Sequence, residues 1–401
     1  MDSGQSTASS GYDVIVIGVG GMGSAACYHL ARRGKRVLGL ERFDVPHAMG
    51  SSHGVNRIIR LAYYEDPSYV PLLRRAYELW RELQSDFGEQ LLHITGSADA
   101  SDEHGEVFQG ALRSCELHDL PHEVLSSADL TRRFPAFRLP SDHFALYQPE
   151  GGFLLSERCV VAHVFGALAA GAEIRAREQV LSWTATASGV RVVTDRGSYE
   201  AERLIISAGA WMQSLVPALT SLAQPERQVL AWFQPTSADL FAPARFPVFN
   251  LSVDEGRYYG FPVFGIPGFK VGRYHHREEQ IDPDDFDRAP NPADEAVLRE
   301  FAARYFPAGA GPTMAMMSCI FTNTPDEHFV IDVLPDAPQV VVASPCSGHG
   351  FKFCSVVGEI LADLASRGAT GHDIGLFRLE RIAGAGTGAA AGAEQVPSCA
   401  G

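Results

Sequence analysis

Three glycines near the N-terminus have a spacing that suits the phosphates of a dinucleotide. Gly18, Gly20 and Gly23 stand in GxGxxG register within GVGGMG, and the acidic residue Glu41 follows them. In this pattern the first glycine permits a tight turn, the second lets a pyrophosphate approach the backbone, and the third lets a helix pack closely. The carboxylate of Glu41 can accept hydrogen bonds from ribose hydroxyls. These residues predict a site for NAD or FAD without deciding between the two.

A second segment, GSSHGVNRIIR at 50–60, combines a donor-rich loop with two cations. Ser51 and Ser52 lie in the part of the loop suited to wrapping a cofactor. Arg57 and Arg60 are three positions apart, so they share one face if the segment is helical. Two guanidinium groups on one face suit an anionic ligand or a flat π-system. A solvated surface pair is the equally weighted alternative.

A third segment, SGHGFKF, places glycines directly before a helix. A helix N-terminus at the turn of Gly348, His349 and Gly350 would stabilise the negative charge that builds on a flavin during reduction. Lys352 would add a fixed cation beside it. The alternative is an ordinary connection that carries a surface lysine.

The elements that must position these residues have α/β character. A β-branched run at 12–17 predicts a buried strand, a helix follows as far as Gly34, and a second strand ends at Glu41. The pattern then predicts a helix at 67–86, a helix through Val160, Val164 and Leu168 that stops at Gly171, and a helix within 355–368. It also predicts a hairpin at 177–198, a buried strand that breaks into a glycine turn within 203–211, and a strand at 328–333. Alternating strands between 225 and 325 indicate an antiparallel sheet. We therefore expect a discontinuous FAD-binding domain (11–95, 150–220 and 326–382) and a substrate domain (96–149 and 221–325).

Composition excludes several classes of function. The chain has 401 residues, of which 46% are hydrophobic, and a net charge of −15. A nucleic-acid binder needs a basic face, and anionic membrane surfaces repel an acidic protein. No apolar run reaches the ~20 residues that span a bilayer. The seven cysteines are odd in number and lack zinc spacing, which indicates reduced thiols in a cytoplasm and no metal site. We expect disordered tails at 1–10 and 383–401, because neither segment carries enough apolar side chains.

Together these pieces resemble the family of monomeric sarcosine oxidase and N-methyltryptophan oxidase. Pipecolate oxidase and the fructosyl-amine oxidases are more distant members of the same group. The likeness extends over about 12–379 and is carried, in order, by GVGGMG, GSSHGVNRIIR, LIISAGAW, YYGFP, FKVG, CIFTNTPDEHF and SGHGFKF. The resemblance implies a Rossmann-type FAD-binding domain and a second domain with a largely antiparallel sheet over the flavin.

The resemblance also implies roles for individual residues. Cys319 matches the cysteine that forms a thioether with the 8α-methyl group of FAD. Arg57 matches an arginine that packs against the flavin, and Lys270 matches a lysine that acts in oxygen activation. Arg60 and Lys352 match the pair that holds the substrate carboxylate. The expected FAD-binding set is Gly18, Gly20, Gly23, Glu41, Arg42, Ser51, Ser52, His53, Arg57, Val180, Gly209, Trp211, Cys319, Gly348, Gly350 and Lys352.

The sequence departs from the family pattern in three places. The family has an active-site histidine shortly after the lysine, and here His275 and His276 compete for that role. Strand alternation favours His276, whereas a bulge would select His275. Phe321 and Asn250 replace a tyrosine and a methionine that lie near the substrate in the sarcosine enzyme, whereas the active-site tyrosine, Tyr259, is retained. A larger N-methyl amino acid or a cyclic imino acid is therefore at least as well favoured as sarcosine.

The resulting hypothesis is an FAD-dependent oxidase of secondary or N-methyl amino acids. Hydride transfer to the flavin would give an imine and, with O2, hydrogen peroxide. Lys270, Arg57, Tyr259 and one of the two histidines would surround the reacting atoms. The alternative is a flavin-dependent oxidase or dehydrogenase of a cyclic imino acid, similar to pipecolate or proline, in a biosynthetic pathway. We expect a monomeric cytoplasmic enzyme whose partners are a small amino acid and O2, with no nucleic acid and no membrane.

Overall fold

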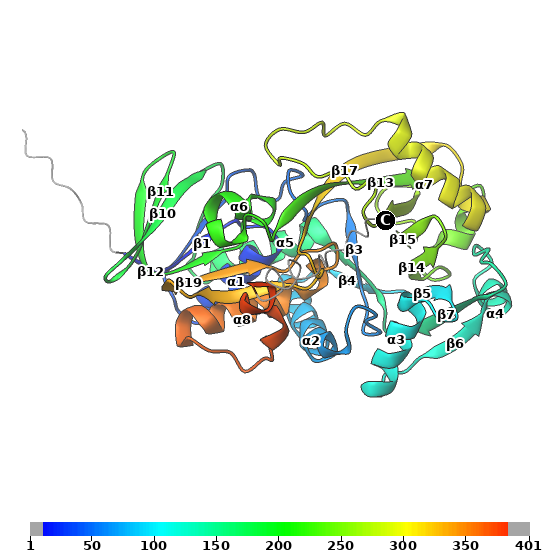
Figure 1. The fold of residues 1–401 in the computed structure, drawn as a ribbon, viewed down its shortest axis with the longest axis horizontal. Helices are drawn as coiled ribbons and strands as arrows, with labels where there is room; N and C mark the ends of the chain where they lie inside the picture. The colour runs from blue at the N-terminus through cyan, green and yellow to red at the C-terminus, as the bar shows by residue number, and fades with distance from the viewer. Residues whose placement is uncertain (1–10, 384–401) are drawn as a thin grey trace, which may run out of the picture.

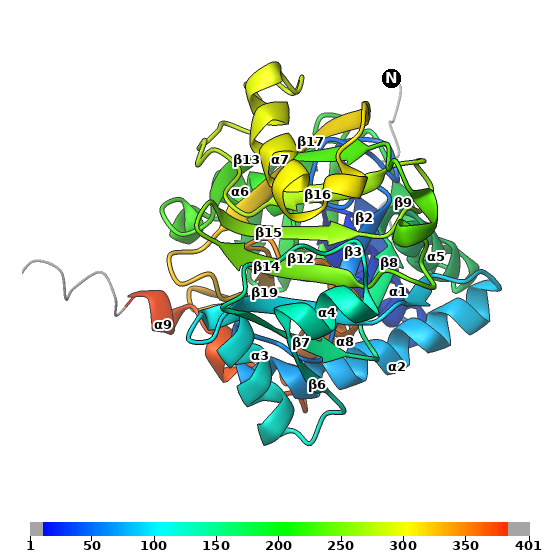
Figure 2. The same cartoon turned by 90° about the vertical axis from the view of Figure 1, so that its right-hand side faces the viewer.

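The computed structural model describes residues 11–383 (Figures 1 and 2). The tail expected at 1–10 lies outside the described residues, as does the second tail from 384 onward. Ala383, which was expected to begin that tail, is the last residue of helix α9 (Glu380–Ala383). Among the described residues, no helix combines the length and the apolar character needed to cross a bilayer.

A first eight-stranded sheet forms the part of the molecule at the left of Figure 1. Its order is β10-β11-β12-β1-β2-β9, and β19 pairs with both β12 and β18. The pairs β12–β1, β1–β2, β2–β9 and β12–β19 are parallel, whereas β10–β11, β11–β12 and β18–β19 are antiparallel. The strands are β1 (Tyr12–Ile17), β2 (Val37–Leu40), β9 (Glu173–Arg175), β10 (Val180–Thr186), β11 (Gly189–Thr194), β12 (Ser198–Ile206), β18 (Val330–Leu334) and β19 (Ala337–Ser344).

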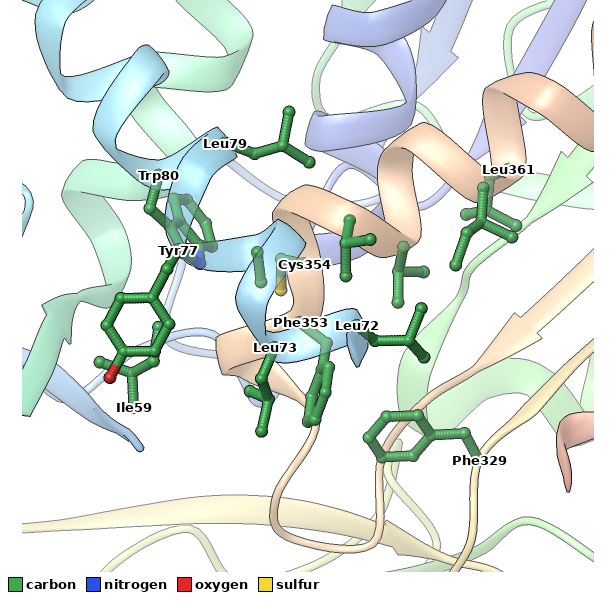
Figure 3. Close-up of a cluster of buried hydrophobic side chains, with 14 of the residues drawn as sticks. Ile59, Leu72, Leu73, Tyr77, Leu79, Trp80, Phe329, Phe353, Cys354 and Leu361 are labelled. Carbon is green, nitrogen blue, oxygen red and sulfur yellow. The ribbon is translucent and has the colours of Figure 1, made fainter. Parts of the chain in front are cut away.

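Both faces of this sheet are covered, which explains why β1 is a continuous apolar run. Val14 and Val16 pack with side chains of the helices on one face, and Ile15 and Ile17 belong to a separate apolar cluster that includes Met212 of α6. Figure 3 shows how side chains of α2 and α8 pack together beside this sheet, with Trp80 from α2 among them. The helices are α1 (Gly21–Arg32), α2 (Val70–Phe87), α5 (Ser156–Ala169), α6 (Met212–Leu215) and α8 (Cys354–Arg367).

A second eight-stranded sheet lies at the right of Figure 1 and faces the viewer in Figure 2. Its order is β17-β13-β16-β15-β14-β5-β7-β6, and every pair is antiparallel except β14–β5. The mixed α/β fold with a largely antiparallel second sheet is thus confirmed. The strands are β5 (Ser97–Asp102), β6 (Glu123–Ser126), β7 (His143–Gln148), β13 (Gln224–Phe233), β14 (Val248–Val253), β15 (Gly256–Phe261), β16 (Phe269–Arg273) and β17 (Thr313–Asn323).

The two faces of the second sheet differ in character. One face packs against α7 (Pro292–Tyr305) and α4 (Ser127–Arg133) through a cluster of aromatic side chains. The opposite face carries polar residues in one cross-strand row, because Asp99 pairs with Asn250, Asn250 with Tyr259, and Tyr259 with Gly272. Directly opposed residues point to the same side of a sheet. Helix α3 (Glu106–Leu117) packs beside β5 and β7.

A small antiparallel sheet of order β3-β8-β4 supplies Arg57. Its strands are β3 (Asn56–Ile59), β4 (Leu92–Ile94) and β8 (Gly152–Leu155). Arg57 therefore lies on a strand, and Arg60 follows the end of that strand. The helical arrangement that would place both guanidinium groups on one face is wrong, because neighbouring side chains in a strand alternate.

Single-turn 3-10 helices complete the described chain. They are η1 (Pro67–Tyr69), η2 (Gly209–Trp211), η3 (Pro217–Leu219), η4 (Ala238–Phe241), η5 (Pro307–Gly309), η6 (Phe351–Phe353) and η7 (Gly375–Phe377). The strands of the first sheet fall within 11–95, 150–220 and 326–382, and those of the second within 96–149 and 221–325. On this distribution we propose the same division into two domains that the sequence suggested.

Candidate active site

The turn between β1 and α1 is shaped by its glycines. Gly18 has a φ of 84°, and a Cβ there would lie 2.6 Å from the carbonyl oxygen of Ser207. A Cβ on Gly23 would lie 1.7 Å from the carbonyl oxygen of Gly18, so only glycine lets α1 start this close to the turn. Gly20 directly precedes α1. The free N–H groups of that helix start can bind a phosphate.

Glu41 and Ser52 border the same turn. Glu41 follows β2 and accepts hydrogen bonds from the backbone N–H groups of Val19 at 2.9 Å and Phe43 at 3.0 Å. The Ser52 hydroxyl accepts one from Gly21 at 3.1 Å. A carboxylate has about four acceptor sites, so Glu41 keeps capacity for the hydroxyls of a ribose.

A long cavity of about 340 Å³ extends from this turn to β17 and the glycine turn before α8. Gly23, His53 and Lys352 do not line it, although they were expected to contact the cofactor. The other expected cofactor residues do line it, namely Gly18, Gly20, Glu41, Arg42, Ser51, Ser52, Arg57, Val180, Gly209, Trp211, Cys319, Gly348 and Gly350.

Arg42, Trp211 and Asp284 line this cavity together. The guanidinium carbon of Arg42 lies 5.6 Å from the Trp211 ring centre. Asp284, which lies between β16 and α7, accepts hydrogen bonds from Arg42 at 2.6 Å and from the Trp211 indole at 2.8 Å. Asp284 thus ties both residues to the segment between β16 and α7 at one end of the long cavity.

Cys319 lies near the other end of the cavity, on β17, and is only 4% exposed. The Arg57 guanidinium lies 3.4 Å from its sulfur and also donates to the carbonyl oxygen of Ser51 at 2.8 Å. Burial alone would raise the pKa of this thiol, but Arg57 and neighbouring His53 lower the pKa to about 7. The thiolate is the nucleophilic form of cysteine, so Cys319 is activated at neutral pH.

His53 is a buried polar residue near Cys319, behind the wall of the cavity at this end. The residue is 3% exposed, and neither ring nitrogen has a hydrogen-bond partner among the described residues. Buried polar atoms are normally paired. A cofactor with phosphates at one end and a polar heteroaromatic ring at the other would fit the helix start at Gly20 and the surroundings of His53 and Cys319. FAD has this composition.

A smaller inner cavity, of about 40 Å³, adjoins the long cavity. The two cavities share Arg57, Cys319, Phe321, Gly348 and Phe351 as lining residues. The remaining wall of the inner cavity is mostly aromatic and contains one lysine. It consists of Ile58, Tyr259, Phe261, Tyr274, His349 and Lys352.

Lys352 is the cation of the inner cavity. Its ammonium group donates to the carbonyl oxygen of His349 at 2.7 Å and lies 5.2 Å from the ring centre of Tyr63. Burial, reinforced by nearby Arg60, lowers the pKa of Lys352 to about 7. A bound carboxylate would favour the charged form, so this lysine suits the carboxylate of an amino acid.

Arg60 lies close to this region but lines neither the long cavity nor the inner cavity. Its guanidinium binds both oxygens of Glu65, at 2.9 and 2.8 Å, and the carbonyl oxygen of Ala62 at 2.6 Å. Its Nε lies 3.5 Å from Asp99, which accepts a hydrogen bond from Asn250 at 2.7 Å. The expected clamp of Arg60 and Lys352 is therefore not preformed, and Asn250 lies behind Arg60 rather than on a cavity wall.

Lys270 is held away from the cavities, on the polar face of β16. Its ammonium donates to the carbonyl oxygens of Gly54 and Asn56 and to the Asn56 side chain, each at 2.8 Å. Burial, reinforced by Arg57, holds the pKa of Lys270 well below its usual range. Lys270 thus lies directly behind the segment that carries Arg57.

The structure does not support either histidine at the cofactor face. Strand β16 ends at Arg273, so the alternation that favoured His276 stops before it. The His276 side chain is completely buried, 3.2 Å from Asp294. His275 has a φ of 51°. It lines a separate outer cleft of about 700 Å³, which Tyr274 also lines. Neither residue lines the long or the inner cavity.

Tyr274 occupies the place expected for the histidine. Lys270, Gly272 and Tyr274 alternate along one face, and the Tyr274 ring lies 5.2 Å from the ring of Tyr259. Counting two residues at a time from Lys270 would have identified Tyr274. Sequence reasoning also missed Glu65, Asp99 and Asp284. The contacts that bring these residues to the site depend on partners distant in sequence or on loop geometry.

Comparisons with known proteins agree with this geometry. Residues 13–364 match the family described as FAD dependent oxidoreductase. The chain is 42% identical over 380 residues to a monomeric sarcosine oxidase of Bacillus sp. (strain NS-129), a match that covers 94% of this chain and 98% of that protein. It is 35% identical over 375 residues to an N-methyl-L-tryptophan oxidase of Yersinia pestis (strain Pestoides F), which covers 92% and 99%. The resemblance inferred from sequence is confirmed.

Solved structures show the same fold. NikD, an unusual amino acid oxidase essential for nikkomycin biosynthesis, superposes with a TM-score of 0.80 at 27% identity, which covers 92% of this chain and 97% of that one. An L-proline dehydrogenase of P. horikoshii also has a TM-score of 0.80, at 20% identity and with 94% and 98% coverage. At that identity the second match supports the fold alone.

Proposed function

Because the chain belongs to the FAD dependent oxidoreductase family, we propose that it oxidises a secondary or N-methylated amine of an amino acid. The chemistry that FAD supplies when bound is acceptance of a hydride from the carbon beside the amine, followed by reoxidation with O2 to give hydrogen peroxide. The amine becomes an imine, which water hydrolyses. The observation that carries this proposal is the inner cavity, where Cys319 and Lys352 line one small space.

The residues of the long cavity would hold FAD along its length. The start of α1 at Gly20 would bind the pyrophosphate, and Glu41 would accept the ribose hydroxyls. Cys319 would hold the 8α-methyl group in a thioether, because its thiolate is stabilised by Arg57. The sulfur would replace one hydrogen of that methyl group, which would leave as a proton, and the two electrons would pass to the ring and then to O2. The turn at Gly348 and Gly350 would present the positive end of η6 and α8 to the reduced ring.

The substrate carboxylate would bind to Lys352 and Arg60. Charge-assisted hydrogen bonds to these two groups would orient the amine toward the cofactor. Since Arg60 is bound to Glu65, the substrate must replace Glu65 as the partner of the guanidinium. Tyr259 and Phe321 would form the apolar walls around the reacting carbon.

Oxygen activation is the role we propose for Lys270. A buried cation stabilises the negative charge that develops on oxygen as it is reduced. Lys270 lies behind Arg57 and Asn56 rather than on a cavity wall. Its contribution would therefore be electrostatic, through the segment that separates it from the cofactor.

The same site would accept a cyclic imino acid, and two departures from the sarcosine pattern motivate that second candidate. Phe321 lines the inner cavity, and Asn250 binds Asp99 behind Arg60. A flavin-dependent oxidase or dehydrogenase of a ring amine would need the same carboxylate partners. The two candidates differ in the amine that is oxidised and in the release of peroxide.

A substrate panel tests the proposal. The purified holoenzyme should be yellow and should release peroxide in air with sarcosine, N-methyl-L-tryptophan, L-pipecolate or L-proline, but not with glycine, which lacks a secondary amine. Bleaching of the flavin by a substrate without peroxide in air would identify a dehydrogenase instead. A folded protein that takes up no flavin, or whose flavin no amine bleaches, would contradict the proposal.

We also propose a monomeric, cytoplasmic enzyme. A relative of 42% identity is named a monomeric sarcosine oxidase, and the cysteines within residues 11–383 are free of disulfides. Size-exclusion chromatography with light scattering should give the mass of one chain, 43.4 kDa, plus its cofactor. A stable dimer would contradict the first part, and an export-dependent activity in the native cell would contradict the second.

A further inference from the structure

The inner cavity is separated from a much larger outer cleft by two side chains. The outer cleft has a volume of about 700 Å³, compared with about 40 Å³ for the inner cavity. Tyr274 and His349 are the two residues that line both spaces. Tyr274 is 9% exposed and His349 is 4% exposed. They therefore form a partition one side chain thick between the site and the cleft.

His349 is the fixed half of the partition. Burial lowers the pKa of this imidazole to about 4, so it is neutral at pH 7. One ring nitrogen donates to the carbonyl oxygen of Glu327 at 2.9 Å, and the other accepts from the hydroxyl of Tyr63. Its ring also stacks on Phe329, with centroids 4.9 Å apart. Movement of His349 would break both hydrogen bonds.

Tyr274 is held by ring packing and is the movable half. Its ring lies 5.2 Å from Tyr259 and 5.9 Å from Phe321, both of which line the inner cavity. On the side of the outer cleft, the guanidinium of Arg257 covers the ring at 4.0 Å. Arg257 is anchored by Glu327 at 3.3 Å. Contacts of this kind are individually weak, about 1–2 kcal/mol for a cation–π pair, so rotation of Tyr274 is the less costly way to join the two spaces.

The size of the inner cavity then limits the substrate. At about 40 Å³ the inner cavity is the smallest of the three spaces described, compared with about 340 Å³ for the long cavity and about 700 Å³ for the outer cleft. The long cavity occupies the side of Cys319, and aromatic side chains close most of the rest. A substituent on the α-carbon has one direction in which to extend, through the position of the Tyr274 ring and into the outer cleft.

We propose that Tyr274 is the residue that restricts this enzyme to N-methyl amino acids with small side chains, by closing the inner cavity toward the outer cleft. The inference rests on the proposed oxidase function and adds the substrate class to it. It also decides for small substrates where Phe321 and Asn250 left larger ones at least as well favoured from sequence. Substrate enters from the outer cleft when Tyr274 rotates, and the ring then closes behind a small amino acid.

The test compares sarcosine with N-methyl-L-tryptophan in the flavin-loaded enzyme, measured as kcat/KM from peroxide release. The wild type should prefer sarcosine by about a hundredfold or more. Tyr274→Ala should reduce that preference by at least about tenfold, chiefly through a lower KM for N-methyl-L-tryptophan. Tyr274→Phe, which keeps the ring, should retain the wild-type ratio. Tyr274→Leu provides a second small variant if the alanine variant does not retain flavin.

The outcomes separate this inference from the proposed function. Absence of peroxide and of flavin bleaching with every amine would contradict the function itself. If the wild type has a higher kcat/KM for N-methyl-L-tryptophan than for sarcosine, the proposed role of Tyr274 is overturned before any variant is tested. An unchanged ratio in flavin-loaded Tyr274→Ala or Tyr274→Leu would also overturn it, because a merely structural tyrosine would lower both activities together.

Discussion

Glu65 binds Arg60 through both carboxylate oxygens, at 2.9 and 2.8 Å from the same guanidinium nitrogen. The side chains are 9% and 1% exposed. Burial alone would raise the pKa of Glu65, but Arg60 lowers the pKa to about 2. Glu65 is therefore charged at neutral pH, and under the proposed role of Arg60 it would compete with a substrate carboxylate for the guanidinium.

Replacement of Glu65 by glutamine should strengthen carboxylate binding. The amide leaves Arg60 with a neutral neighbour, so we expect acetate to bind about tenfold more tightly, which corresponds to about 1.4 kcal/mol. Acetate carries the carboxylate but no amine, and its binding is read from the flavin absorbance spectrum. Glu106→Gln is the matched control, since Glu106 is an exposed residue of the outer cleft. Unchanged or weaker acetate binding by Glu65→Gln would refute the competition.

Cys319→Ala should abolish covalent attachment of the flavin. Acid precipitation should then release all of the flavin from the variant and none from the wild type. Cys346→Ser should behave as the wild type, because burial raises the pKa of Cys346 to about 11 although that residue lines the same cavity. Flavin that stays with denatured Cys319→Ala would exclude this attachment site.

The rate of attachment should depend on the ionisation of Cys319. Its pKa of about 7 predicts that apoprotein mixed with FAD forms the bond more slowly at pH 6 than at pH 8, with little further gain above pH 8. Arg57→Met should move this profile to higher pH, because the guanidinium stabilises the thiolate. A profile that is flat between pH 6 and pH 8 would contradict the assigned thiolate.

Gly23→Ala should prevent cofactor binding. The new methyl group would lie 1.7 Å from the carbonyl oxygen of Gly18, so α1 must move away from the turn, at a cost of ~3 kcal/mol or more. Thermal unfolding and flavin content measure the effect. Gly371→Ala has open space around the new atom and should leave both quantities unchanged. A Gly23→Ala protein with full flavin content would show that close packing of α1 is dispensable.

Lys270→Met should separate the two halves of the catalytic cycle. Loss of the buried cation should slow reoxidation by O2 by about 10²–10³-fold, whereas anaerobic reduction of the flavin by substrate should change much less. Stopped-flow absorbance measures each half separately. Equal losses in both halves would indicate that Lys270 positions Arg57 and Asn56 instead.

His275 should make stability depend on pH. Hydrogen bonds to Glu226 and Glu327 raise its pKa from 6.5 to about 9, so its contribution is complete below pH 6.5 and is lost as the pH rises through 9. Because its side chain is 34% exposed, we expect a loss of only about 1 kcal/mol in the free energy of unfolding. Urea unfolding at pH 6.5 and 9.5 should show this loss in the wild type and less of it in His275→Gln.

The local patterns in the sequence predicted most of the fold. The structure has the glycine turn, the hairpin at 177–198 and helix α8 where the sequence predicts them, because each depends on neighbouring residues. The antiparallel character of 225–325 was also visible, since alternation is a local property. The order of strands in each sheet was not visible, because it depends on pairing between distant segments such as Ile17 and Ile206.

The candidate site was predicted less completely. Lys352 and the glycines were found through motifs, whereas Cys319 was found through the family resemblance; Lys352, Cys319, Gly18, Gly20, Gly348 and Gly350 line adjoining cavities. The pairing of Arg60 with Glu65 was missed, because nothing in the spacing distinguishes it from a surface pair. The histidine assignment failed for a different reason: the end of β16 at Arg273 decides which side chain faces the site, and strand ends are poorly marked in sequence.

The pairing of β1 with β12, and of β12 with β19, has a consequence for biosynthesis. The first glycine turn is synthesised long before β19 and α8, which follow it by most of the described chain. Gly21 at the start of α1 packs against Cys354 of α8 so closely that a Cβ would lie 2.5 Å from its sulfur. Nascent chains that have not yet reached α8 therefore lack one packed side of the proposed cofactor site.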